Sequence, residues 1–458
     1  MSQPEARESG IVTVLAARAA ELRAQPLTEE SEGAARRAFV DWLGVTLEGS
    51  SGTPAVALLA GLGSGGQFGP SRIVGHDARA PAPLAALING TAAHTLELDD
   101  IYAPGLFHPG APVIAAALAA ADELDAPSSL LWRAVVTGYE VGCRVAADLG
   151  PAHYEHWHTT GTAGALGAAA AAAEVRQAGP DVVAHALALA ATMAGGLQQT
   201  FRSNAMGKPL HAGAAAQAGV IAAAAAAGGV TGALDVLEGP AGLAAATGSV
   251  TSWPRSRASL ARPWAVESVT VKPHPCCGHA FAVIDAVAEL RSKGVRAEDV
   301  TELRVQTYAT ALTVAGIAAP RTEAERRFSI PYLAAAALAG GPDGITADTV
   351  AGQPVVRALT DRIRLSVGEV FEQRFPQRRG ARVTAILADG TPVVAEVPDR
   401  SGSPENPLTQ DQIRGKFLAG CVPFFGEDSP AVLAALLRTG EGRVSDLDVA
   451  GHRQPSDR

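Results

Sequence analysis

Residues 156–173 read HWHTTGTAGALGAAAAAA, a short polar and titratable entrance followed by an uninterrupted run of small residues. The run has no proline and no strand-like alternation, so it predicts a helix. Small side chains such as Gly161, Gly164 and Gly167 allow the backbones of neighbouring helices to approach closely. The stretch therefore predicts a densely packed helical bundle.

Segments of the same texture lie on both sides of this stretch. They include SEGAARRAFVDWLGVTL (31–47), LLWRAVVTGYEVGCRVAADL (130–149) and GAAAQAGVIAAAAAA (213–227). Almost nothing before residue 260 alternates like a strand. The uncharged run 218–230 is rich in Ala and Gly, which carry too little transfer free energy to drive membrane insertion. We therefore predict a large all-helical domain over residues 1–265.

The texture of the chain changes after Pro263. Short β-branched segments appear at 266–271, 300–308 and 361–367, and 381–397 reads as two strands joined by an Asp-Gly turn. These segments predict a second, α+β domain over 266–400. Helical patterns return after the Pro- and Ser-rich linker 401–407, so we expect 401–458 to pack back on the first domain and complete it. The predicted fold class is mainly α with a second α+β domain.

Composition limits the classes of protein that the chain can belong to. A chain of 458 residues that is 47% hydrophobic and 18% charged can bury more than one core, which favours two domains. The net charge of -9 is spread without long like-charge blocks, which argues against nucleic acid as a partner. The N-terminal segment lacks the features of a signal peptide, so we expect a cytoplasmic protein with no membrane partner. Four cysteines fit a reducing compartment and not a disulfide framework.

Cationic or titratable side chains stand just before Ala-rich helical patterns at four places. A helix N-terminus offers unpaired N–H groups and the positive end of the helix dipole, so each place is a candidate cradle for a carboxylate or phosphate. Taken singly, each residue is also explained as a surface lysine or a helix cap. Together they predict a small polyanionic ligand. The four residues are His108, His158, Lys208 and Lys272.

The segment KPHPCCGH (272–279) admits three interpretations, namely a metal site, a thiol nucleophile and an anion pocket. Adjacent cysteines are poorly placed to bind one tetrahedral ion, no C-x-x-C pair exists, and Cys143 and Cys421 lack partners nearby in the sequence. We therefore predict no metal. A thiolate on Cys277 stays open, because a helix start lowers thiol pKa values, although packing is the commoner role of a small buried cysteine.

Carboxylates gather in NGTAAHTLELDDIYAPGLFHPG (89–110) ahead of His108. In a helical phase Glu97 and Asp100 share one face and Asp99 points elsewhere. Such a pair, if buried near cations, would orient a histidine or act as a general base. The alternative is that these acids end a helix and face solvent. The chain contains no Gly-rich phosphate loop, GxSxG elbow or dinucleotide fingerprint.

The assembled motifs resemble the MmgE/PrpD family in order from about residue 10 to 440. The resemblance implies a large helical domain, a smaller α/β lid domain, an active site in the cleft between them, a homodimer, and no metal or organic cofactor. It also implies dehydratase, decarboxylase or epimerase chemistry on a di- or tricarboxylate. The motifs are AHTLELDD with a following HPG, GYEVGCRVA, HWHTTGTAGALGAAAAA, KPLHAGAAAQAG, VKPHPCCGHAFAVIDAV, FSIPYLAAAAL and NPLTQDQIRGKF.

The family's decarboxylase supplies roles for individual residues. The resemblance implies a catalytic set of His108, His158, Lys208, Lys272 and Tyr332. The candidate substrate-binding set is Glu97, Asp100, His274 and Cys277.

This chain departs from the decarboxylase pattern at three points near the acidic cluster and at a fourth in KPHPCCGH. Glu97 replaces an Asp, Ile101 replaces a Thr, one extra residue precedes His108, and Cys277 replaces a His. These changes predict an altered site geometry, so the resemblance does not extend to that decarboxylase's substrate.

Chemistry beside a carboxylate needs cations to hold it, a group that exchanges a carbon-bound proton, and exclusion of water. We expect Lys208 and Lys272 to clamp carboxylates, His108 and His158 to exchange protons, and Tyr332 to donate a hydrogen bond. The first interpretation is a cofactor-independent lyase, a dehydratase or decarboxylase, acting on a small polycarboxylate. The alternatives are an epimerase using the same site and a non-catalytic, helical, dimeric binding protein.

Overall fold

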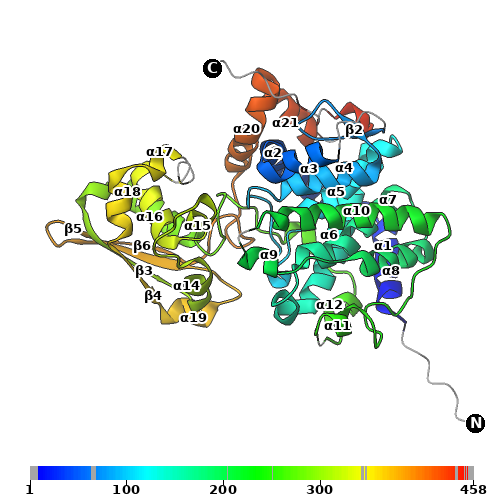
Figure 1. The fold of residues 1–458 in the computed structure, drawn as a ribbon, viewed down its shortest axis with the longest axis horizontal. Helices are drawn as coiled ribbons and strands as arrows, with labels where there is room; N and C mark the ends of the chain where they lie inside the picture. The colour runs from blue at the N-terminus through cyan, green and yellow to red at the C-terminus, as the bar shows by residue number, and fades with distance from the viewer. Residues whose placement is uncertain are drawn as a thin grey trace, which may run out of the picture. The chain divides into compact units, whose positions relative to one another are not determined.

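The chain forms two compact units in its computed structural model (Figure 1). One unit comprises Met1–Thr270 and Gln410–Arg458, and the other comprises Val271–Thr409. Each has its own hydrophobic core. The fold class predicted from the sequence, a large helical domain plus a smaller α+β domain, is confirmed. The structure describes residues 9–62, 69–203, 205–249, 251–341, 345, 348–438, 442–447, 449 and 451.

The first unit is built from helices, with one short antiparallel pair of strands. Its long helices surround an Ala-rich core, and the last two return from the C-terminal part of the chain. The helices are α1 (Ile11–Ala24), α2 (Glu29–Ser50), α3 (Thr53–Gly61), α4 (Ala82–Ala93), α5 (Gly110–Glu123), α6 (Ser128–Tyr154), α7 (Thr159–Val175), α8 (Pro180–Met193), α9 (Gln199–Arg202), α10 (Gly207–Ala227), α11 (Leu243–Ala246), α12 (Pro254–Arg257), α20 (Gln410–Phe425) and α21 (Ser429–Leu437); the strands are β1 (Ser71–Arg72) and β2 (Arg79–Ala80).

Helix α7 is buried along its whole length and packs against α5, α6, α8 and α10. Glycines at its neighbours explain how closely the helices approach. A Cβ added to Gly219 of α10 would lie 2.4 Å from the Cβ of Ala168, and one added to Gly138 of α6 would lie 2.8 Å from the carbonyl oxygen of Gly167. Larger side chains at these contacts would force the helices apart. The small residues of 156–173 therefore set the spacing of the bundle.

Helix α10 is, within the part of the chain that the structure describes, the one helix long and apolar enough to cross a membrane. In its most apolar window 56% of the residues are buried inside the protein, where α10 packs against α4, α7 and α8. A core helix of a globular unit meets the same length and hydropathy criteria.

The second unit contains a four-stranded mixed sheet in the order β4-β3-β5-β6. Strand β3 (Val300–Thr307) runs parallel to β4 (Ile363–Val367) and antiparallel to β5 (Ala381–Leu387), which forms a hairpin with β6 (Pro392–Val397). The hairpin turns at Gly390, whose φ of 84° favours glycine. The helices of this unit are α13 (Phe281–Ser292), α14 (Ala309–Ala315), α15 (Glu323–Arg326), α16 (Ile330–Gly340), α17 (Asp348–Ala351), α18 (Pro354–Thr360) and α19 (Glu369–Arg374).

The prediction of a strand at 266–271 is wrong. Ala265–Glu267 form a turn of 3-10 helix, and only Thr270 makes an isolated antiparallel bridge, with Ile101. The carboxylate of Glu267 accepts a hydrogen bond from the backbone N–H of Trp264 at 3.0 Å. This local bond between a side chain and the backbone competes with an extended conformation and closes the turn.

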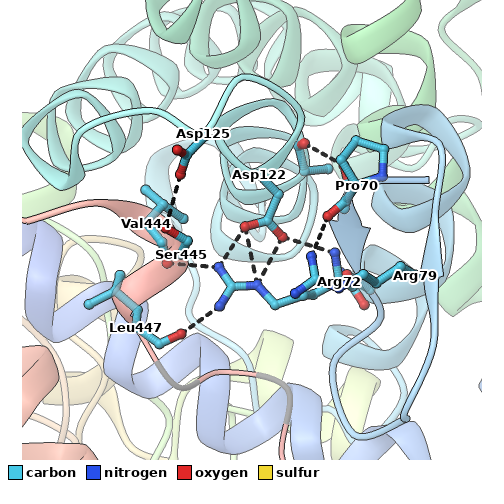
Figure 2. A network of polar contacts seen from close by, with 11 residues as sticks. Pro70, Arg72, Arg79, Asp122, Asp125, Val444, Ser445 and Leu447 are labelled. Carbon is cyan, nitrogen blue, oxygen red and sulfur yellow. Dashed lines mark hydrogen bonds and ion pairs between the residues drawn. The ribbon is translucent and has the colours of Figure 1, made fainter.

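Within the first unit, a buried arginine connects the C-terminal segment to β1 and α5 (Figure 2). Arg72 of β1 forms an ion pair with Asp122 of α5 at 2.5 Å, and both side chains are less than a tenth exposed. The same guanidinium donates hydrogen bonds to the carbonyl oxygens of Val444 at 2.9 Å and Leu447 at 2.5 Å. One charged group therefore joins β1, α5 and the tail.

Replacing Asp122 by Asn is expected to destabilise the first unit by about 3 kcal/mol, because it leaves the Arg72 charge buried without a counter-ion. The matched control is Arg443→Gln. Arg443 pairs with Asp125 on the surface nearby, where each side chain is more than half exposed, so its loss should cost about 1 kcal/mol or less. Urea unfolding followed by circular dichroism measures both shifts, and equal midpoints for the two variants would contradict the assignment.

Candidate active site

Two histidines enclose one buried carboxylate in the first unit. Nδ1 of His94, at the C-terminal end of α4, lies 2.7 Å from Oδ2 of Asp99, and Nδ1 of His108 lies 3.4 Å from the same oxygen. The two imidazole rings meet edge to face with centroids 4.9 Å apart. All three side chains are buried. Asp99 is therefore placed to orient both rings.

The line of histidines continues to the start of α7. The His158 ring stacks on His94 at 5.3 Å, and its Nδ1 lies 3.3 Å from Nδ1 of His211 on α10. Phe201 packs edge to face on His158 at 4.9 Å, and the Nζ of Lys208 lies 5.3 Å from the Phe201 ring. The result is a row of four imidazoles with a carboxylate at one end and an ammonium group at the other.

The first turn of α7 holds this row in place. His158 is the N-cap residue of α7, and its backbone N–H donates to the carbonyl oxygen of Gly196 at 2.8 Å. Its side chain makes no capping hydrogen bond, so the ring remains directed at the other histidines. Thr160 accepts a hydrogen bond from the backbone N–H of His108 at 3.2 Å. Two of the predicted site residues, His108 and His158, are thus fixed by one helix terminus.

The prediction that Glu97 and Asp100 share a helical face is wrong. Helix α4 ends at Ala93, and Glu97 takes a left-handed conformation with a φ of 57°, which turns the chain. The Glu97 carboxylate forms an ion pair with Lys208. Asp100 accepts hydrogen bonds from the Tyr139 hydroxyl at 2.7 Å and from the backbone N–H of Gly110 at 2.9 Å. The helical phase predicted that Asp99 points away from this face, yet Asp99 is the carboxylate that faces the histidines.

Burial and neighbouring charges set the protonation states of the row. Burial by itself would raise the pKa of Asp99, but His94 and His108 outweigh it and hold that pKa well below its ordinary value. Burial lowers the pKa of His158 well below its ordinary value, and the nearby His94, Lys208, His108 and His211 lower it further. At neutral pH Asp99 is therefore a carboxylate and His158 a neutral imidazole.

The remaining predicted residues belong to the second unit. Lys272 is buried and lies nine positions before α13 begins at Phe281, so it does not stand at the helix entrance as predicted. The Tyr332 hydroxyl donates to the carbonyl oxygen of Ile345 at 3.3 Å. His274 packs edge to face on Phe281, with ring centroids 5.8 Å apart. The grouping of these residues with His108, His158 and Lys208 in one site stays a prediction.

The segment 272–279 forms a turn that is tied to the chain before α16. The backbone N–H of Cys277 donates to the carbonyl oxygen of Arg327 at 2.9 Å, and the Arg327 guanidinium donates to the carbonyl oxygen of Pro275 at 3.1 Å. Burial raises the pKa of the Cys276 thiol. Neither Cys276 nor Cys277 lies in the first turn of α13, so the helix-start argument for a thiolate loses its basis.

Among the described residues, the ligand atoms of His94, Asp99 and His108 lie within 4.8 Å of one another, close enough to hold a metal ion. Within this group, Nδ1 of His94 and Oδ2 of Asp99 already form a hydrogen bond with each other. The arrangement has the donor types of a two-histidine, one-carboxylate site, and equally those of an imidazole oriented by a carboxylate. The absence of a metal stays a prediction.

Three members of the row, His94, Asp99 and His211, were not among the residues selected from the sequence. His94 lies inside the AHTLELDD motif, and its partners are non-local except for Asp99. His211 follows Lys208 by three positions on a helix, a spacing that places two side chains on one face. That spacing was the available signal for His211.

Comparison with known proteins defines the class. The MmgE/PrpD N-terminal domain model matches residues 13–255, and the MmgE/PrpD C-terminal domain model matches residues 274–439. The chain belongs to the MmgE/PrpD family, as the resemblance predicted.

Individual relatives carry the comparison further. The chain is 27% identical to cis-aconitate decarboxylase of Homo sapiens over 396 residues, which cover 80% of this chain and 78% of the relative. It is also 27% identical to the Mus musculus enzyme of that name over 398 residues, covering 81% and 78%. A cis-aconitate decarboxylase-like protein, oryM, of Aspergillus oryzae (strain ATCC 42149 / RIB 40) is 25% identical over 379 residues, covering 75% and 77%.

The buried Asp100 predicts a pH dependence of stability. Burial raises its pKa from 3.8 to about 7. The folded state therefore keeps the Asp100 proton that the unfolded chain releases near pH 4, so the stabilisation is complete below about pH 4 and is lost as the pH rises towards 7. Asparagine at position 100 cannot ionise. The melting temperature of Asp100→Asn should therefore fall less between pH 4 and pH 7 than that of the wild type.

Asp361→Asn, at an exposed position, is the matched control and should follow the wild-type profile. Parallel profiles for wild type and Asp100→Asn in thermal melts across this range would contradict the protonation assigned to Asp100.

Proposed function

We propose that the protein is a cofactor-independent lyase, a dehydratase or decarboxylase, acting on a small di- or tricarboxylate. The observation that carries the proposal is the row of His108, His94, His158 and His211 between Asp99 and Lys208, in which the first three histidines are buried. Strongly shifted pKa values of buried titratable groups cluster at functional sites. The decarboxylases among its relatives support the same class of reaction.

The lysine supplies the charge that this chemistry needs. Removing a proton or CO₂ beside a carboxylate leaves negative charge on the substrate, and a fixed cation stabilises that charge. Lys208 lies in the first turn of α10, where the helix dipole adds positive potential. In the free protein Glu97 neutralises Lys208, so a substrate carboxylate would take the place of Glu97 at Nζ. Lys272 is proposed as the second cation of the clamp.

The histidines divide the proton transfers. His158 is neutral at neutral pH and is proposed as the base. His108 lies beside the ionised Asp99, which stabilises a proton on its ring, so His108 is proposed as the acid. His94 is proposed to hold Asp99 in position between the two roles. His274, Cys277 and Asp100 are proposed to line the substrate site, and Tyr332 to donate to a carboxylate or leaving hydroxyl.

The assembly and location are proposed with the function. We expect a cytoplasmic homodimer whose partner is a small polycarboxylate and not nucleic acid or a membrane. Four buried cysteines without disulfides fit a reducing compartment, and the net charge of -9 disfavours nucleic acid. Light scattering after size exclusion measures the oligomeric state directly.

Epimerisation is a second candidate. Inverting a carbon centre needs one group to remove a proton and another to deliver one, and His108 and His158 are two separate proton carriers in one row. Incubation with a panel of polycarboxylates in D₂O, followed by NMR, separates the candidates. An alkene or CO₂ identifies a lyase, and an inverted, deuterated product identifies an epimerase. No exchange, elimination or CO₂ from any compound would instead favour a binding protein.

Replacing His158 by Gln should lower kcat by about 100-fold or more, because it removes the proposed base while keeping the side chain polar. The control is His156→Gln, two residues away, whose exposed side chain should leave kcat within about twofold of wild type. Deuterium incorporation by NMR measures both. Comparable rates for the two variants would exclude His158 from proton transfer.

Lys272→Met should abolish measurable turnover, with a loss of about 100-fold or more in kcat/KM, because the proposed clamp loses one of its two cations. Lys293→Met provides the control, since that lysine is exposed and pairs with Glu289, four positions earlier in the chain. The far-ultraviolet circular dichroism of both variants should match wild type. Near-normal kcat/KM in Lys272→Met would remove this lysine from the mechanism.

A further inference from the structure

A group of basic and aromatic residues lies at one end of the sheet in the second unit. Tyr308 directly follows β3, Arg379 shortly precedes β5, and Arg400 shortly follows β6. Because β5 runs antiparallel to both neighbours, its start lies beside their ends. The register pairs are Gln306 with Arg382 and Ala381 with Val397. The backbone N–H of Arg400 donates to the carbonyl oxygen of Arg379 at 3.2 Å, which joins the two chain segments.

A stacked pair of aromatic rings lies on one side of the Arg379 guanidinium. Its Cζ lies 5.7 Å from the centre of the Phe375 ring, and Phe375 stacks on Tyr308 with centroids 4.5 Å apart. The Tyr308 hydroxyl lies 2.8 Å from Nδ1 of His279. We call these residues, with Arg400, the Arg379 cluster. Its members supply guanidinium, hydroxyl and imidazole groups against an apolar wall.

The cluster carries positive charge that its own residues do not balance. Arg379 is 8% exposed, its Nε is buried without a hydrogen-bond partner, and its guanidinium makes no ion pair with any residue that the structure describes. Arg400 is 3% exposed and donates to the carbonyl oxygen of Gly278 at 2.9 Å. Burial, with Arg379 nearby, lowers the pKa of Arg400 to about 10. Burying an unpaired cation costs free energy unless an anion compensates it.

Three carboxylates of this unit, Asp285, Asp399 and Glu372, have other partners. Asp285 accepts hydrogen bonds from the backbone N–H and the hydroxyl of Ser401, at 2.8 and 2.7 Å. Asp399 forms an ion pair with Arg378, and Glu372 accepts from the backbone N–H of Ala309 at 2.7 Å. Within the described part of the chain, therefore, none of these three carboxylates pairs with Arg379.

We propose that the Arg379 cluster binds a small oxyanion, a phosphate or carboxylate group, with Arg379 as its main counter-ion. A guanidinium presents a planar fork of N–H donors that matches either group. The bound oxygen atoms would satisfy the buried Nε of Arg379 and neutralise its guanidinium. The Tyr308 hydroxyl and the His279 ring provide further hydrogen-bonding groups beside it. This inference is independent of the proposed lyase activity.

The test measures binding of inorganic phosphate and of succinate by isothermal titration calorimetry at low ionic strength. The full chain carries Lys208→Met and Lys272→Met, so that the proposed catalytic cations do not contribute. In this background, Arg379→Met should weaken binding about tenfold or more, because a charge-assisted contact is lost. Arg378→Met is the matched control, because the Arg378 side chain is nearly half exposed and pairs with Asp399. Its replacement should change affinity by about twofold or less.

Thermal melts supply a second readout that a purely structural role would not reproduce. Without anions, Arg379→Met should melt at or above the temperature of its parent, because an unpaired buried charge is gone. Phosphate or succinate should raise the melting temperature of the parent and not of Arg379→Met. The tighter of the two ligands identifies the chemical group. Failure of both to bind, or equal binding by Arg379→Met, would overturn the proposal whatever the outcome of the activity assays.

Discussion

The close approach of helix backbones around α7 is the constraint on which the first unit depends. Glycine and alanine at the contacts with α6 and α10 leave no room for larger side chains. The same spacing brings the start of α7, with His158, beside the start of α10, with Lys208 and His211. The small residues at these contacts therefore also position the titratable side chains. A change in helix spacing would change the distances between those side chains.

Much of this architecture could be predicted from the sequence because its causes are local. The Ala-rich runs predicted helices α7 and α10, and alternation with an Asp-Gly turn predicted strands β5 and β6. The position of His158 directly before a helical pattern predicted it as a site residue. The turn at Glu97 could not be predicted, since a left-handed conformation at a non-glycine residue has no local signal. The importance of Asp99 follows from that turn. The place of His94 in the site could not be predicted either, because its ring contacts with His108 and His158 depend on how the helices pack.

Charge is handled differently in the two units. In the first, the buried Arg72 is paired with Asp122, and the buried Asp99 lies between two histidines. In the second, Arg379 is buried beside Arg400 with no ionic partner in the described residues. A buried charge with a structural role usually has a counter-ion within the protein. A buried charge without one is a candidate site for a charged ligand.

The Glu97–Lys208 pair gives the first unit a resident carboxylate at the position where an incoming one would be held. If the substrate binds Lys208 as proposed, its entry would exchange one anion for another, and the net charge around Lys208 would change little. Affinity would then reflect how much better the newcomer fits than the side chain it displaces, and molecules with a single acidic group would compete poorly. Selectivity for molecules with several acidic groups would follow from competition and not from attraction alone.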